Sequence, residues 1–306
     1  MPKILICEKV DPVCSRIFQD CGCEVEVRTD LSPEDLAAVI GEYDGLVVRS
    51  ATRVTAELMA KGTRLKAVGR AGAGVDTIDV DAAGKADIAV LNTPGQNANG
   101  VAELAVGLMF ALVRHLVEAN VSMRAGRWEK KRFSGTELLG KTLGLVGFGA
   151  IGRRVGAIAR GIGMKVLAYD PLLNDEQIKA GGAEPVDLDG LLAGSDFVSL
   201  HLPKTPETVN LIDAAAIEKM KPGSHLINCA RGGLVDEAAL AEALTSGRLA
   251  GAALDVFAVE PPPADHPLLA LENCLVTPHL GASTEESQVN VAASIAEQMV
   301  DFFRRG

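Results

Sequence analysis

The chain has 306 residues, which is enough for two domains of ordinary size. Its hydrophobic content of 48%, its 32 glycines and its aromatic content of only 4% suit a soluble α/β protein. The net charge of −10 argues against nucleic acid or an anionic membrane as a general partner, but it leaves room for a small anionic substrate beside local arginines. Six scattered cysteines lack the spacing of a metal site or a disulfide framework, so we expect a cytoplasmic protein.

The N-terminal part of the chain alternates strand-like and helical patterns, which predicts a parallel sheet with helical crossovers. The first apolar run starts at residue 3 and has none of the features of a signal peptide. Ser32 followed by Pro33 indicates a helix start, with a capping residue and a first-turn proline. The predicted strands of this part are residues 3–7, 24–28, 45–49, 65–69 and 88–91.

A nearly all-apolar helix is predicted over about residues 99–119. A helix that is apolar on every side belongs in an interior, so we place a domain junction just before it. A capping-box pattern at residues 283–286 precedes a final amphipathic helix, which would make the first domain discontinuous if it packs there. We therefore predict one domain from residues 1–96 plus 282–306 and a second from residues 97–281.

The second part opens with an apolar strand that runs into Gly147-Phe-Gly149-Ala-Ile-Gly152. This motif alone also occurs in glycine-rich turns that bind nothing. Inside a βαβ unit, with an acidic residue about 20 positions further on, it indicates a dinucleotide whose pyrophosphate meets a helix N-terminus. Asp170 ends the second strand of that unit and can accept hydrogen bonds from ribose hydroxyls. Because its carboxylate repels a 2′-phosphate, NAD is favoured over NADP.

Three later apolar runs each end on a charged or titratable residue, namely Arg231, Glu260 and His279. If the runs are parallel strands, all three side chains reach the carboxyl edge of one sheet, where ligands bind in α/β proteins. A hydride-transfer enzyme needs a group that binds the anionic substrate and a group that transfers a proton, and a guanidinium and an imidazole serve these purposes. Taken singly, an arginine before a helix is often solvated, and a Pro-His turn is often structural.

Several motifs together resemble the D-2-hydroxyacid dehydrogenases over nearly the whole chain. They are Arg70-Ala-Gly-Ala-Gly-Val-Asp, the glycine motif with Asp170, Asn228-Cys-Ala-Arg231-Gly-Gly, Asp255-Val-Phe with Glu260-Pro-Pro, and Pro278-His279-Leu-Gly-Ala-Ser. Val48-Arg49-Ser-Ala-Thr and Gly135-Thr-Glu-Leu resemble in particular the members that act on D-3-phosphoglycerate. The resemblance implies two doubly wound parallel-sheet domains, a flavodoxin-like substrate domain and a Rossmann NAD-binding domain, with an active-site cleft between them.

By position, the resemblance makes His279 the acid/base, Glu260 the hydrogen-bond partner of its far ring nitrogen, and Arg231 the group that polarises the substrate. Asp255 is similar to the residue that reads the nicotinamide carboxamide, although a role as a turn or helix cap is the alternative. The implied cofactor-binding residues are Gly147, Gly149, Ala150, Ile151, Gly152, Asp170, Leu202, Cys229, Ala230, Asp255, Gly281 and Ala282.

Arg49 and Arg70 also end strand-like runs, and two arginines suit recognition of a phosphorylated hydroxyacid. Gly72 and Ala73 would offer backbone N–H groups to its carboxylate. The alternative for the arginines is a pair of surface salt bridges. Ala73 stands where many family members carry a hydroxyl residue.

Two further positions qualify the resemblance. Ala150 stands where many members have an arginine, which removes one pyrophosphate contact. Cys229 is not expected to be a nucleophile, because the local sequence suggests no histidine partner.

A basic cluster surrounds Trp128 in this acidic chain and consists of Arg124, Arg127, Lys130, Lys131 and Arg132. It is either a solvated face or an arm at a two-fold interface that adds positive field to a partner's active site. Nucleic acid is not expected to bind it, given the net charge.

The implied activity is the reversible, NAD-dependent oxidation of D-3-phosphoglycerate to 3-phosphohydroxypyruvate, the first step of L-serine biosynthesis. The alternatives are a reductase of glyoxylate, hydroxypyruvate or another 2-keto acid, and an NADH-sensing corepressor without turnover. The expected partners are a small phosphorylated 2-hydroxy or 2-keto acid and further copies of the chain, in a homodimer or higher homo-oligomer, with no nucleic acid, membrane or metal. The 306 residues themselves include no regulatory domain, so we expect no feedback inhibition by serine through such a domain within them, and whether the natural protein continues is left open.

Overall fold

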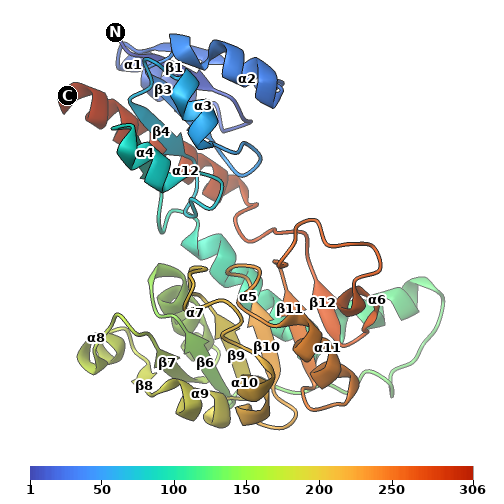
Figure 1. The fold of residues 1–306 in the computed structure, drawn as a ribbon. Coiled ribbons are helices and arrows are strands. Elements are labelled where there is room, and N and C mark those ends of the chain that lie inside the picture. The colour runs from blue at the N-terminus through green and yellow to red at the C-terminus, as the bar shows by residue number, and fades with distance from the viewer. Residues whose placement is uncertain (306) are drawn as a thin grey trace. The chain divides into compact units, whose positions relative to one another are not determined.

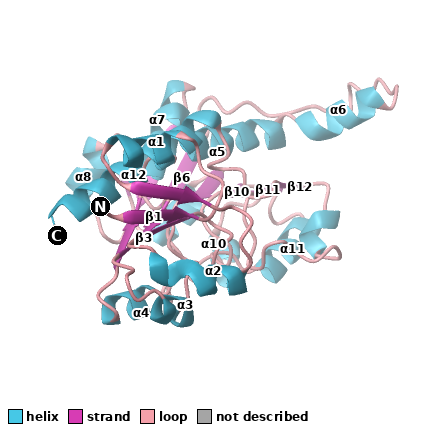
Figure 2. Cartoon of the chain, turned by 90° about the horizontal axis from the view of Figure 1, so that it is seen from above, coloured by secondary structure: helices cyan, strands magenta, loops and turns pink. Residues whose placement is uncertain are grey.

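The computed structural model describes residues 1–305, and the chain divides into two compact units. Unit 1 combines Met1–Asn97 with the segment from Ser283 onward, and unit 2 is Ala98–Ala282. Both boundaries lie one residue beyond those derived from the sequence. Each unit contains one parallel sheet with helices on both faces (Figures 1 and 2), which confirms the predicted α/β class.

The sheet of unit 1 has its strands in the order β2-β1-β3-β4-β5. The strands are β1 (Lys3–Ile6), β2 (Glu24–Val27), β3 (Gly45–Val48), β4 (Ala67–Arg70) and β5 (Ala89–Asn92). The helices are α1 (Val13–Asp20), α2 (Pro33–Val39), η1 (Ile40–Glu42), α3 (Ala56–Lys61), α4 (Val80–Lys85) and α12 (Glu285–Arg305). Leu5 of β1 packs with α2, α3 and α4, whereas Ile4 and Ile6 pack with α1 and α12, because successive strand residues face opposite sides.

Helix α12 completes one face of the unit 1 sheet. Ile295 and Met299 are fully buried there, and a Cβ atom at Gly69 of β4 would stand 2.3 Å from the Met299 sulfur. Only glycine therefore allows this close approach. The hydroxyl of Thr284 accepts the N–H of Ser287 at 3.1 Å, so the helix is capped one residue later than the capping-box pattern predicts.

The sheet of unit 2 has its strands in the order β12-β11-β10-β9-β6-β7-β8. The strands are β6 (Thr142–Val146), β7 (Lys165–Tyr169), β8 (Glu184–Pro185), β9 (Phe197–Leu200), β10 (His225–Asn228), β11 (Gly251–Leu254) and β12 (Cys274–Val276). The helices are α5 (Ala98–Val113), α6 (Leu116–Arg124), α7 (Ala150–Gly161), α8 (Asp175–Ala180), α9 (Leu188–Gly194), α10 (Ala214–Lys219), α11 (Glu237–Thr245) and η2 (Pro267–Ala270). Leu145 and Phe197 pack with α5 and α7, while Val146 and Val198 pack with α9, α10 and α11.

The structure corrects the prediction of one helix over residues 99–119. Helix α5 ends at Val113, and α6 begins after His115, which has a left-handed φ of +51°. The carbonyl of Val113 accepts the N–H of Thr136 at 2.9 Å instead of continuing the helical ladder. The two helices are bent by 62° at the break, and α6 extends from the body of unit 2 (Figure 2).

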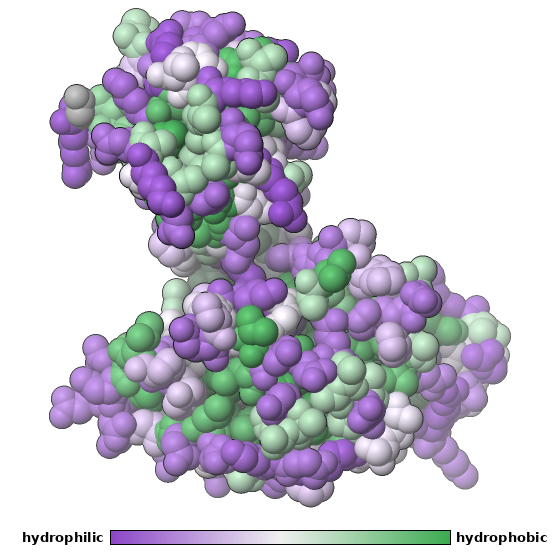
Figure 3. All heavy atoms as spheres, in the orientation of Figure 1, coloured by the Kyte–Doolittle hydropathy of each residue, from purple (hydrophilic) through white to green (hydrophobic). Residues whose placement is uncertain are grey.

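Ten of the sixteen residues of α5 are buried, as expected for a helix that is apolar on every side. Within the described part of the chain, no single helix has both the length and the apolar composition needed to cross a membrane. Only α5 and α6 taken as one bent pair meet that test. In the view of Figure 3, hydrophilic residues spread over the surface of each unit, with apolar patches between them.

Candidate active site

Arg231, Glu260 and His279 follow three neighbouring strands of unit 2. Strands β10, β11 and β12 are adjacent and parallel, and their last residues pair with one another. The three residues therefore come from one carboxyl edge of one sheet, the edge at which α/β folds bind ligands.

A hydrogen bond joins His279 to Glu260. The Nδ1 atom of the ring lies 2.8 Å from one carboxylate oxygen of Glu260, and the other oxygen accepts the N–H of Phe257 at 3.1 Å. Because a carboxylate only accepts, Nδ1 carries a proton and Nε2 is the ring atom left to exchange one. The side chains of His279 and Glu260 are 51% and 38% exposed and border a cavity of about 360 Å³, so a ligand can reach them.

Asp255 holds the main chain that carries His279. His279 has a left-handed φ of +56°, and its N–H donates to the Asp255 carbonyl at 2.9 Å. One carboxylate oxygen of the buried Asp255 accepts the N–H of Leu280 at 2.7 Å and the hydroxyl of Thr277 at 2.5 Å. The other oxygen accepts the N–H of Gly281 at 2.8 Å. Three consecutive amides are thus fixed by one residue, which corresponds to the turn-capping alternative for Asp255.

Hydrogen bonds inside one turn fix the backbone of Arg231. The buried Asn228 side chain donates to the Arg231 carbonyl at 2.9 Å and accepts the N–H of Ala230 at 3.0 Å. The guanidinium of Arg231 donates to the Ala230 carbonyl at 2.7 Å. A Cβ atom at Gly232 would stand 1.7 Å from the Phe257 carbonyl oxygen, so this turn packs directly on the segment that leads to Glu260.

The glycine motif forms the tight passage from β6 into α7. Gly147 has a φ of +94°, and a Cβ atom there would stand 2.7 Å from the His201 carbonyl oxygen. A Cβ atom at Gly152 would stand 2.3 Å from the Gly147 carbonyl oxygen, so the helix closes on the strand only with glycine. No side chain caps α7 at Gly149, and the space where a Cβ of Gly149 would point is open. The start of α7 therefore has open space beside Gly149.

Asp170 follows β7 and lies next to this motif. Its two oxygens accept the N–H groups of Phe148 and Leu172 at 2.8 and 2.9 Å. The carboxylate is therefore fixed beside the start of α7, at the position that suits a ribose.

A row of polar side chains crosses the sheet one residue beyond the last paired positions of β9 to β12. These residues are His201, Cys229, Asp255 and Thr277. Burial lowers the pKa of His201 to about 4, so its ring is neutral at pH 7. Its Nε2 lies 3.0 Å from the Ser199 hydroxyl, and Nδ1 is buried with no hydrogen-bond partner in the described residues.

His201 and Cys229 each follow the last paired residue of the adjacent strands β9 and β10, an arrangement that the local sequence does not reveal. Burial, with the nearby Asp255 charge, nevertheless raises the pKa of the Cys229 thiol far above its usual range. The thiol stays protonated at neutral pH and is therefore unsuited to attack as a nucleophile.

The remaining cofactor residues derived from the sequence lie around the same edge. Ala150 and Ile151 open α7, and the side chain of Leu202 lies against Gly147. The N–H groups of Ala230 and Gly281 already donate within the chain, so any backbone contact from them to a nicotinamide uses their carbonyls. Cys229 is buried beside Ala230, and Ala282 is the last residue of unit 2.

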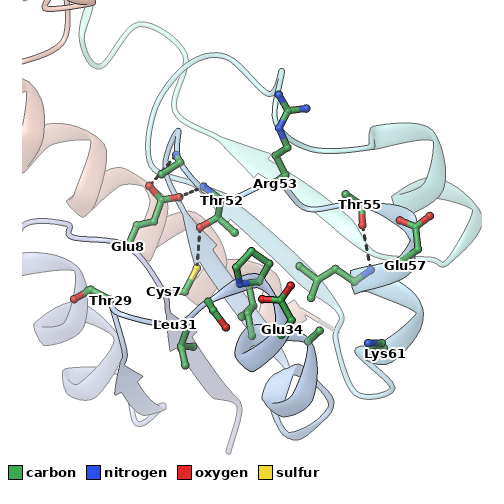
Figure 4. Close-up of a pocket in the computed structure, with 16 residues that line it drawn as sticks. Cys7, Glu8, Thr29, Leu31, Glu34, Thr52, Arg53, Thr55, Glu57 and Lys61 are labelled. Carbon is green, nitrogen blue, oxygen red and sulfur yellow. Dashed lines mark hydrogen bonds between the residues drawn. The ribbon is translucent and has the colours of Figure 1, made fainter. Parts of the chain in front are cut away.

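In unit 1, the carboxylate of Glu8 holds the loop that carries Arg49. It accepts the N–H groups of Arg49 at 2.8 Å, Ala51 at 3.1 Å and Thr52 at 2.9 Å. The Arg49 guanidinium donates to the Lys9 carbonyl at 3.2 Å, while its buried Nε has no partner among the described residues. Figure 4 shows Glu8 turned toward the Thr52 backbone, on one wall of a cavity of about 640 Å³.

Arg70 and Gly72 lie against each other at the end of β4. A Cβ atom at Gly72, which has a φ of +151°, would overlap the Arg70 guanidinium. The Gly72 N–H donates to the Arg70 carbonyl at 2.8 Å, whereas the sequence predicts that it is offered to a substrate carboxylate. The Ala73 carbonyl accepts the Asn92 side-chain amide at 2.5 Å. The turn after β4 thus owes its shape to internal hydrogen bonds.

Residues 106–281 match the family model described as D-isomer specific 2-hydroxyacid dehydrogenase, NAD binding domain. The chain belongs to this family. This confirms the resemblance seen in the sequence, and it makes unit 2 the NAD-binding domain of a D-2-hydroxyacid dehydrogenase.

Two relatives of this chain are named D-3-phosphoglycerate dehydrogenase. The protein of Synechocystis sp. is 48% identical over 301 residues, which cover 98% of this chain and 54% of the relative. The protein of Archaeoglobus fulgidus is 46% identical over 299 residues, which cover 98% and 57%. The chain thus spans about half the length of these curated relatives. A solved structure of NAD⁺-bound 3-phosphoglycerate dehydrogenase from Entamoeba histolytica is 33% identical, with a TM-score of 0.84 and coverage of 100% of this chain and 96% of that one.

The residues of unit 2 fit NAD. The open space at Gly149, together with the uncapped first amides of α7, suits a pyrophosphate at a helix N-terminus. The fixed carboxylate of Asp170 can accept hydrogen bonds from ribose hydroxyls and would repel a 2′-phosphate, which fits NAD rather than NADP.

Proposed function

We propose that this dehydrogenase oxidises the C2 hydroxyl of D-3-phosphoglycerate to the carbonyl of 3-phosphohydroxypyruvate, at the first step of serine synthesis. The observation that carries the proposal is the hydrogen bond between His279 and Glu260, at the sheet edge that also carries Arg231. The names of the two relatives support the choice of substrate.

When bound, NAD would supply the acceptor for the hydride of C2. His279 removes the C2 hydroxyl proton through Nε2 while the C2–H bond breaks, so the carbon–oxygen single bond becomes a carbonyl. Glu260 stabilises the resulting imidazolium through Nδ1, 2.8 Å away. Arg231 holds the carboxylate beside C2 and polarises the oxygen. In the reverse direction, His279 returns the proton.

The phosphate of the substrate requires a second group of cations. Arg49 and Arg70 follow or end neighbouring strands of unit 1, β3 and β4. The backbone of Arg49 is fixed by Glu8, and the Arg70 guanidinium is seated over Gly72. We assign phosphate recognition to these two arginines, because guanidinium groups match phosphate oxygens in pairs.

A substrate panel with NADH tests the function. We expect 3-phosphohydroxypyruvate to be reduced with a far higher kcat/KM than hydroxypyruvate or glyoxylate. Arg49→Ala and Arg70→Ala should each remove most of that preference, because each removes a charge-assisted contact worth about 1.5–3 kcal/mol, or roughly 10- to 100-fold. Lys61→Ala, which removes a cation from α3 of the same unit, is the matched control and should leave the preference unchanged.

Equal rates with phosphorylated and unphosphorylated keto acids in the unmodified protein would reject the phosphoglycerate assignment and favour a general 2-keto acid reductase. His279→Ala should still bind NADH but lose turnover. A protein that binds NADH and reduces no 2-keto acid would instead be a sensor of the NADH level.

We also propose that the dehydrogenase is a homodimer or higher homo-oligomer assembled through α6. Four apolar side chains of this helix are at least half exposed, namely Leu116, Val117, Val121 and Met123, and Trp128 beyond it is 79% exposed. Part of the surrounding basic cluster is paired within the chain, since Arg127 and Arg132 contact Glu129. An apolar patch that pairs with its own copy buries both surfaces.

Light scattering tests the assembly. Val121→Glu should convert the oligomer to a monomer, because two carboxylates would meet in an apolar interface. Val80→Glu changes a similarly exposed valine of unit 1 and should leave the mass unchanged. A monomeric unmodified protein would end this proposal.

All six cysteines are free thiols in the structure, and five of them are buried. This supports the further proposal that the protein works in the reducing cytoplasm.

A further inference from the structure

A second histidine–glutamate pair lies in unit 2, next to the one that the proposed reaction uses. Nε2 of His266 lies 3.1 Å from one carboxylate oxygen of Glu237, and their side chains are only 14% and 18% exposed. Glu237 is the first residue of α11, and His266 immediately precedes η2. The reaction itself requires neither residue.

The other oxygen of Glu237 accepts the N–H of Ala258 at 2.7 Å. The preceding amide, that of Phe257, donates to Glu260 at 3.1 Å. Two consecutive amides of one turn are therefore held by two different carboxylates. Because Glu260 also binds the His279 ring, the position of this turn sets where that ring is held.

Contacts on the side of Arg231 fix the same turn. The His266 ring packs edge-on against Phe257, with ring centroids 5.5 Å apart. The Phe257 carbonyl lies so close to Gly232 that no side chain fits between them. Helix α11 is the next element after the Arg231 turn in the chain, so Glu237 links the segment that follows Arg231 to the turn that carries Glu260.

We propose that Glu237 and His266 are positioning residues for the proton transfer. They touch no reactant. His266 orients the Glu237 carboxylate, Glu237 fixes the Ala258 amide, and the fixed turn holds Glu260 against His279 at the correct distance from Arg231. This inference rests on the proposed function, since its readout is turnover.

A double-mutant cycle in the full chain, with 3-phosphohydroxypyruvate and NADH, tests the inference. Glu237→Ala should lower kcat about tenfold while the KM for NADH changes less than about twofold, because misplacement of a reacting group affects the rate more than cofactor binding. In a Glu260→Ala background the same change should lower kcat less than about twofold, because residues that act through one group are not additive.

Two conservative variants distinguish loss of positioning from a failure to fold, because each keeps part of the original contacts. Glu237→Gln retains an oxygen that can accept the Ala258 amide and should recover most of the lost kcat. His266→Leu keeps an apolar contact with Phe257 but removes the nitrogen, and should act in the same direction as Glu237→Ala with a smaller effect. Glu176→Ala removes a first-turn acid from α8 and serves as the control with unchanged kinetics.

Equal losses from Glu237→Ala in both backgrounds would overturn the inference, because they would indicate general destabilisation. An unchanged kcat in both Glu237→Ala and His266→Leu would also overturn the inference. An unmodified protein that reduces none of the keto acids would reject the proposed function instead, so the two failures are distinguishable.

Discussion

Two carboxylates hold His279 in different ways. Glu260 binds the ring, whereas the Asp255 carboxylate binds the two amides that follow His279, and the Asp255 carbonyl accepts the N–H of His279 itself. A left-handed φ at a non-glycine residue is uncommon and persists where the surroundings determine it. The direction of the ring is therefore set as much by a buried aspartate as by its hydrogen-bond partner.

Asp255→Asn should weaken this turn. Asparagine keeps one acceptor oxygen but presents an NH₂ group where a second oxygen now receives an amide, so a buried donor is left unpaired. We expect a loss of about 1–3 kcal/mol in the free energy of unfolding, measured in urea, together with a lower kcat. Asp187→Asn is the control, because only one oxygen of that capping residue is used and asparagine preserves it. Unchanged stability and kcat would show that the turn does not need both oxygens.

The sequence identified the residues of this edge whose role follows from their position after a strand. Arg231, Glu260 and His279 could be found in this way, because parallel strands bring their carboxyl ends together. Glu237 and His266 could not, since they are 29 residues apart and meet only through the packing of α11 against η2. The sequence alone shows only that Glu237 is an acid at a helix start and that His266 is a histidine in a loop, and neither feature indicates that they pair.

At the scale of elements, alternation and turn residues located nearly all strands of unit 1 within about one residue, a typical precision for such boundaries. The error at α5 had a tertiary cause. An apolar pattern does not show that the Val113 carbonyl finds its partner in Thr136 instead of the next helical turn. The cap of α12 shifted similarly, because Thr284 and the preceding serine both resemble capping residues in the sequence.

The loop after β3 should be sensitive to acid through Glu8. Burial of Glu8 raises its pKa, but the amides of Arg49, Thr52 and Ala51 together outweigh burial and leave the pKa below its usual value. A carboxylate whose pKa is lowered by folding stabilises the protein above the unfolded pKa, and that contribution is lost as the pH falls through the folded pKa.

We expect the free energy of unfolding of unit 1, followed by circular dichroism in urea, to fall between pH 6 and pH 3. Glu8→Gln should lower stability at pH 7 by about 1–3 kcal/mol and make it less dependent on pH in that range. Glu34→Gln, an exposed acid of α2, provides the comparison. A Glu8→Gln protein with the same acid dependence as the parent would contradict this account.

At the scale of the whole molecule, the two units carry different functional residues. Unit 2 carries the glycine motif with Asp170 and the proposed proton-transfer residues, all within one continuous stretch of chain. Unit 1 carries Arg49 and Arg70 and depends on α12, which belongs to the other end of the sequence. A change in α12 should therefore affect unit 1 without directly touching the cofactor site.

Met299→Asp tests this independence. It places a charge against Gly45 and Gly69, where no water is available, and should destabilise unit 1 by more than about 4 kcal/mol. Limited proteolysis should then cut unit 1 while a fragment that spans unit 2 survives. Val289→Asp changes a half-exposed residue of the same helix and should leave the digestion pattern unchanged. Simultaneous loss of both units would show that they unfold together.

The return of α12 to unit 1 has a consequence for synthesis on the ribosome. Translation delivers all of Ala98–Ala282 before the residues that seal the first sheet, so the NAD-binding unit can fold while its older neighbour is still open along one face. Until Ile295 and Met299 leave the exit tunnel, α12 cannot cover its part of this face of the sheet, where α1 also packs. Unit 1 thus begins before unit 2 in the chain and is completed after it.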